Sequence, residues 1–140
     1  MVQKIKAAAA ILVANVLLGS LGISEGFGAT PSGLTRSDSG GGVTVKVTYL
    51  NPQAGDDTRF QVILDTHSVN LDAYDLKALS LLRDDTAKTY QPTGAEDNGG
   101  GHHREVTVSF PKLTPGTKGL ELVIKDIAGV KERTFRWDLQ

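Results

Sequence analysis

The chain of 140 residues contains no cysteine, and its only methionine is Met1. The absence of cysteine excludes disulfide bonds, thiolate nucleophiles and thiolate metal ligands. A formal net charge of −1 provides no broad basic surface for nucleic acid. Histidine is also scarce, since His67, His102 and His103 are the only ones. The fold must therefore depend on a hydrophobic core, and the histidines are its most distinctive side chains.

The first residues have the pattern of a secretory signal peptide. Lys4 and Lys6 form a basic head, residues 7–23 are uncharged and mostly apolar, and small residues follow. We expect residues 1–29 to be this signal peptide, which would place the protein in the periplasm or the extracellular space. The alternative is a retained anchor, but the apolar run is broken at Asn15 and is shorter than the roughly 20 residues that span a bilayer. We expect membrane contact only through this segment, if it stays uncleaved.

The rest of the chain has the pattern of one all-β domain. Glycine, serine and proline are frequent in residues 30–42, which predicts a flexible linker. Short alternating apolar runs separated by turn residues predict a β-sandwich domain over residues 43–140. The predicted strands cover residues 43–49, 60–65, 76–82, 88–91, 106–110, 120–124 and 135–139. Residues 76–82 also have a helical pattern, and residues 93–101 are expected to form a loop. About seven short strands favour an immunoglobulin-like antiparallel sandwich.

The histidines flank two of these strands. His67 follows the second predicted strand, and His102 and His103 precede the fifth. In an antiparallel sandwich of immunoglobulin topology these two strands are neighbours, so the histidines are expected at one end of the fold. Extending the strand alternation directs Asp65, His67 and His103 outward. The same alternation directs His102 and Arg104 toward the interior. His103 is therefore the expected companion of His67.

Imidazole and carboxylate groups in this place suit a divalent metal ion, either Zn²⁺ or Cu²⁺. The lack of any methionine beyond Met1 argues against Cu⁺. The expected ligands are His67 together with His103, His102 or both. Asp65 would complete the coordination sphere or orient an imidazole from behind. The alternative is that the histidines only bond to backbone groups or face solvent.

Asp72, Asp75 and Arg104 are secondary candidates near the histidines. The two aspartates would support the same metal site or bind a cation such as Ca²⁺ through oxygen atoms. An Asx-type turn is the simpler explanation for both of them. Arg104 would bind an anion or pair with Asp75, and the ion pair is the simpler expectation.

Several short stretches of the sequence resemble those of a group of small exported microbial β-sandwich domains whose function is uncharacterised. These stretches are residues 64–72 (LDTHSVNLD), 74–76 (YDL), 100–104 (GGHHR) and 132–137 (ERTFRW). The likeness extends over residues 43–139. It implies an exported β-sandwich domain and implies no particular substrate.

These observations predict an exported binding module with a Zn²⁺ or Cu²⁺ site at its histidine-rich end. A second possibility is a protein-interaction or adhesion module, in which the histidines shape a surface for an unknown protein partner. A hydrolase built on Ser68, Asp72 and a histidine is the weakest alternative, because nothing around Ser68 resembles a nucleophile elbow.

Overall fold

The computed structural model describes residues 32–52 and 56–139. The predicted signal peptide and the start of the predicted linker lie outside these residues. The described chain is all-β, with one short helix and one 3₁₀ turn. The elements are η1 (Ser32–Leu34), β1 (Thr35–Gly40), β2 (Val43–Tyr49), β3 (Thr58–Thr66), α1 (Leu76–Leu79), β4 (Ser80–Asp84), β5 (Thr89–Tyr90), β6 (Gly94–Gly100), β7 (His103–Phe110), β8 (Gly119–Ile127) and β9 (Val130–Asp138). None of the described helices is long and apolar enough to cross a membrane.

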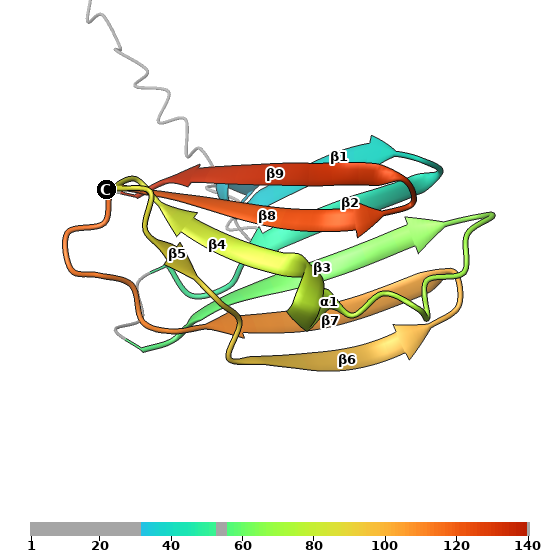
Figure 1. Ribbon diagram of the computed structural model, residues 1–140, viewed down its shortest axis with the longest axis horizontal. Helices are drawn as coiled ribbons and strands as arrows, with labels where there is room; N and C mark the ends of the chain where they lie inside the picture. Colours follow the sequence, from blue (N-terminus) through green and yellow to red (C-terminus); the bar gives the residue numbers. More distant parts are fainter. Residues whose placement is uncertain (1–31, 53–55, 140) are drawn as a thin grey trace, which may run out of the picture.

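The strands form two antiparallel sheets that stack as a sandwich (Figure 1). The five-stranded sheet has the order β1-β2-β3-β7-β6, and the four-stranded sheet has the order β5-β4-β8-β9. The predicted second and fifth strands are β3 and β7, and they are hydrogen-bonded neighbours as expected. Their register places Asp65 directly opposite His103.

The core lies between the two sheets and consists of the alternating apolar residues that the sequence indicated. Every second side chain of β2, β3 and β7 is buried, as the half-buried strand pattern predicts. Aromatic rings form its centre, where Phe60 lies 5.0 Å from Tyr49, 5.9 Å from Phe110 and 5.1 Å from Trp137 between ring centroids. Such a core holds the strands in one register, because a slip of one residue would expose a whole apolar face.

Residues 35–40, which belong to the predicted linker, form strand β1. This strand pairs with β2 along its whole length, and interactions from β9 hold it in place. Arg133 donates to the Asp38 carboxylate at 2.9 Å, and the Trp137 indole donates to the Leu34 carbonyl at 2.9 Å. The local sequence is polar and glycine-rich, so the strand is stabilised by distant partners that its own residues do not reveal.

Two further segments differ from the sequence prediction. Residues 94–100 form the edge strand β6 in place of the predicted loop, and they pair with β7 along their whole length. Residues 76–79 form the helix α1, and the predicted strand begins only at Ser80. The helix begins at Asp75, whose side chain accepts hydrogen bonds from the backbone N–H groups of Lys77 and Ala78. This N-cap explains why the helical pattern prevails at the start of the segment.

Candidate functional site

The two strands that carry the histidine-rich end bring Asp65 and His103 into direct contact. The His103 Nδ1 atom is hydrogen-bonded to the Asp65 carboxylate. Both side chains point to the outer face of the five-stranded sheet, with 62% of the His103 side chain and 53% of the Asp65 side chain exposed. The predicted outward direction of both residues is confirmed. Because the pair is exposed, its contribution to the free energy of folding is small, about 0–1 kcal/mol.

His67 and His102 are also exposed, each in a turn beside the Asp65–His103 pair. The prediction that His102 points inward is wrong. Strand β7 begins only at His103, and His102 lies in the turn after Gly101, whose φ is +70°. Strand alternation therefore ends before it reaches His102. The His102 carbonyl accepts a 3.0 Å hydrogen bond from the Thr66 backbone N–H, which ties this turn to the end of β3.

Thr66 fixes the turn that carries His67. Its hydroxyl donates to the Gly42 carbonyl at 2.7 Å and accepts from the backbone N–H groups of Ser68 and Val69 at 3.2 and 3.1 Å. The Thr66 side chain is buried on the inner side of the sheet, so His67 is held on the outer side. Thr66 of the Thr-His-Ser stretch therefore has a structural role in this turn, whatever the function of His67.

Asp72 and Asp75 act on backbone groups. The Asp72 carboxylate accepts a 2.8 Å hydrogen bond from the Gly101 N–H, next to His102. It also lies so close to Gly100 that a Cβ atom there would be 2.9 Å from the Asp72 Oδ1 atom. Asp75 caps α1. The expected Asx-type role is therefore confirmed for Asp75 only, since the local turn at Asp72 is made by the Asn70 side chain, which accepts from the Asp72 N–H. Asp72 instead positions the turn that bears the histidines.

Arg104 is buried, as strand alternation predicted, but the predicted partner Asp75 is wrong. Its guanidinium pairs with Asp97 on β6 and donates to the backbone carbonyls of Leu71 and Tyr74. The Asp75 carboxylate instead caps the N-terminus of α1. Arg104 thereby joins the loop between β3 and α1 to strand β6.

A surface hollow of about 260 Å³ adjoins the Asp65–His103 pair and is lined by Gly42, Thr44, Asp65, Thr66 and His67. Asp65 and His67 thus share one hollow, and His103 is bonded to Asp65 from the other side. The structure brings three of the predicted ligands, His67, Asp65 and His103, to one end of the sheet. Within residues 32–52 and 56–139, however, no group of three or more His, Cys, Asp or Glu side chains is already arranged around one metal position.

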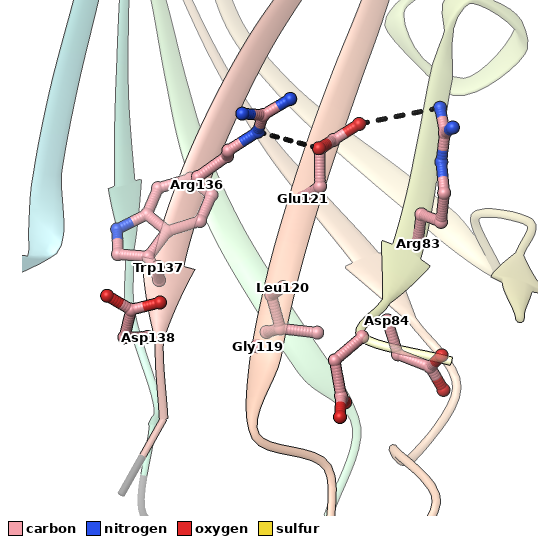
Figure 2. A pocket seen from close by; sticks show the side chains of 9 residues that line it. Arg83, Asp84, Gly119, Leu120, Glu121, Arg136, Trp137 and Asp138 are labelled. Carbon is pink, nitrogen blue, oxygen red and sulfur yellow. Dashed lines mark hydrogen bonds and ion pairs between the residues drawn. The ribbon is translucent and has the colours of Figure 1, made fainter. Parts of the chain in front are cut away.

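A second hollow, of about 180 Å³, lies over the far sheet where β4, β8 and β9 meet (Figure 2). Glu121 stands between two arginines there, 2.7 Å from the Arg136 Nε atom and 3.5 Å from an Arg83 guanidinium nitrogen. Asp85 accepts a 3.0 Å hydrogen bond from the Lys118 backbone N–H. Glu121 and the two arginines thus pair with one another, while the Arg83 Nε atom is buried without a hydrogen-bond partner.

Asp84 lines the same hollow and has a structural role that the sequence did not reveal. Its carboxylate is buried and accepts hydrogen bonds from the Thr86 hydroxyl at 2.7 Å and the Tyr90 hydroxyl at 2.9 Å. Hydrogen bonds, above all from the Thr86 side chain, lower the pKa of Asp84, although burial acts in the opposite direction. Adjacent aspartates such as Asp84 and Asp85 are typical of exposed turns, so the local sequence does not reveal this buried role.

Comparison of the chain with protein-family models, with curated proteins and with solved structures found no match. The fold and the site define an all-β sandwich protein with a polar, histidine-rich end. A function for it must therefore be argued from the residues of that end.

Proposed function

We propose that this protein is an exported binding module of the immunoglobulin-like class that takes up a divalent transition-metal ion, Zn²⁺ or Cu²⁺, at its histidine-rich end. The strand order supports the immunoglobulin-like class. The order β2-β3-β7-β6 in one sheet and β4-β8-β9 in the other corresponds to the A-B-E-D and C-F-G sheets of that architecture. Strands β1 and β5 are then additions at the sheet edges.

The contact between Asp65 and His103 carries the metal proposal. A carboxylate that accepts the Nδ1–H of an imidazole fixes the tautomer in which Nε2 has a free lone pair, and metal-binding histidines are commonly held in this way. The His103 ring is more than half exposed, so its Nε2 atom is accessible to an ion from solvent. Asp65 is therefore the orienting group in this proposal, and His103 is the first ligand.

His67 is the proposed second ligand. It shares the hollow with Asp65, and its exposed side chain is free to change rotamer. His102 is the third candidate, on the turn held by Thr66 and Asp72. Because side chains must move to close the site, ordering them reduces the affinity below that of a preorganised zinc centre.

Calorimetric titration of the purified protein with Zn²⁺ and with Cu²⁺ tests the proposal. We expect saturable binding of one ion per chain, lost in His103→Ala and in His67→Ala. Asp65→Asn should keep the ligands but weaken binding by about 10–100-fold, as loss of an orienting carboxylate does in metal sites. Glu132→Ala, on an exposed position of β9, is the control that should leave binding unchanged. Binding weaker than millimolar, or binding that both histidine variants retain, would refute the proposal.

A further inference from the structure

Strand β6 forms a long open edge of the five-stranded sheet. It is the last strand in the order β1-β2-β3-β7-β6, and no other described segment lies beyond it (Figure 1). Residues 95–100 of this strand are exposed. An edge strand has backbone N–H and C=O groups on its free side that no neighbour satisfies, and these groups can pair with another extended chain.

The other sheet edges in the described residues are short or covered. Strand β5 has only two residues. Strands β1 and β9 lie against each other, and the Arg36 guanidinium donates to the Arg136 carbonyl at 2.9 Å across this side of the sandwich. Strand β6 is therefore the long edge that is left for pairing within the part of the chain that the structure describes.

The composition of β6 favours the close approach of a partner strand. Four of its seven residues are glycine or alanine, namely Gly94, Ala95, Gly99 and Gly100. The strand contains no proline and no lysine, the residues that commonly protect sheet edges from pairing. A chain laid along this edge meets few bulky side chains.

The charge of this edge is negative. Register and alternation place Glu96 on the outer face of the sheet, and Glu105 of the neighbouring β7 lies on the same face opposite Asn98. Asp97 has its charge compensated by Arg104, which is buried. Arg59, two strands away, pairs with Asp57 at 3.1 Å, and its charge interacts more weakly with that of Glu96. The exposed Glu96 carboxylate has no cation on β6 or opposite it on β7, whereas the half-buried Glu105 carboxylate accepts a 2.6 Å hydrogen bond from the Gln61 side chain.

From these observations we infer that the β6 edge binds an extended segment of another protein that carries Lys or Arg at alternate positions. Backbone hydrogen bonds would provide most of the affinity, as in other cases of strand addition, and a cationic side chain opposite Glu96 would select the partner. A second copy of this chain is a poorer partner, because it would bring a strand of the same negative charge. This inference does not depend on metal binding.

The test uses a short synthetic peptide of alternating threonine and lysine, with a matched peptide that has glutamate in place of lysine. Binding to the full-length protein is measured by titration in the presence of a chelator, so the result is independent of any metal site. Amide hydrogen exchange of β6 is followed in the same samples. We expect the lysine peptide to bind and to slow exchange in β6, and we expect the glutamate peptide to do neither.

Charge variants make the test specific. Glu96→Lys should weaken binding of the lysine peptide by about tenfold, since an attractive cross-strand pair becomes a repulsive one. Glu132→Lys makes the same change of charge on β9, in the other sheet, and should have no effect. The affinity of Glu96→Gln for the lysine peptide should lie between those of Glu96→Lys and Glu132→Lys. Circular dichroism checks that each variant is folded. Equal effects of Glu96→Lys and Glu132→Lys, unchanged exchange in β6 with the lysine peptide, or pairing of β6 only between copies of this chain would overturn the inference.

Discussion

Replacement of Arg104 by methionine should destabilise both the fold and the histidine-rich end. Arg104 has a side chain that is only 9% exposed, and it holds Asp97, the Leu71 carbonyl and the Tyr74 carbonyl together. Methionine preserves most of the side-chain volume and removes all of these hydrogen bonds. The loop between β3 and α1 would then keep only its hydrogen bonds to Gly101 as attachment to the β6–β7 hairpin.

The expected cost follows from the groups left behind. The Leu71 carbonyl keeps a 3.3 Å hydrogen bond from the Tyr74 backbone N–H, whereas the Tyr74 carbonyl loses its donor, at about 1–3 kcal/mol for a buried acceptor that stays unsatisfied. The Asp97 side chain is 41% exposed, so water replaces part of what it loses. We therefore expect Arg104→Met to lower the free energy of unfolding by about 2–4 kcal/mol, from the lost charged hydrogen bonds and the carbonyl left unsatisfied. Asp97→Asn leaves the carbonyl hydrogen bonds in place and should cost only about 1–2 kcal/mol.

Urea denaturation of the wild type, both single variants and the double variant measures these costs. The double variant should have nearly the same free energy of unfolding as Arg104→Met alone, because Asp97 has already lost its partner in that variant. The reasoning is refuted if Arg104→Met costs less than about 1 kcal/mol, or if Asp97→Asn costs more than Arg104→Met.

Two further predictions concern Asp84 and two glycines in turns. Because hydrogen bonds lower the pKa of Asp84 in the folded state, its stabilising effect is complete above the unfolded-state pKa of about 4 and is lost as the pH falls through the folded-state pKa. Urea denaturation should therefore show a flatter dependence on acid pH for Asp84→Asn than for the wild type, and equal slopes would contradict this. Gly41→Ala should cost about 3 kcal/mol, since its φ is +63° and a Cβ would lie 2.1 Å from the Ala128 carbonyl oxygen. Gly129→Ala, with a φ of +76° and open space, should cost only about 1 kcal/mol in thermal unfolding, and equal costs would refute the steric argument.

The parts of the fold that the sequence predicts are those with their own burial pattern. In residues 43–49, 60–64 and 106–110 every second residue is apolar and buried, because one side of each strand packs into the core. Strands β1 and β6 lack this pattern, because they are edge strands that depend on pairing with β2 and β7. Their formation depends on partners distant in sequence, which a local pattern does not reveal.

The same distinction applies to the candidate site. The pairing of Asp65 with His103 follows from strand adjacency and alternation, both of which the sequence indicates. The direction of His102 does not follow from alternation, because His102 precedes the first residue of β7 and its direction is set by the turn. The Arg104–Asp97 pair also escapes prediction, since residues 93–101 have the composition of a loop.

The most direct test of the metal proposal is the nitrogen NMR spectrum of the three imidazole rings during a Zn²⁺ titration. Our account predicts that His103 Nε2 shifts as the ion binds, while its Nδ1 remains protonated against Asp65, and that a nitrogen of His67 shifts at the same metal concentration. Asp65→Asn should weaken this response without abolishing it. The histidine-rich end is not a metal site if the His103 nitrogen shifts do not change on addition of Zn²⁺. The same conclusion follows if these shifts change equally in the wild type and in His67→Ala, which should lose the ion.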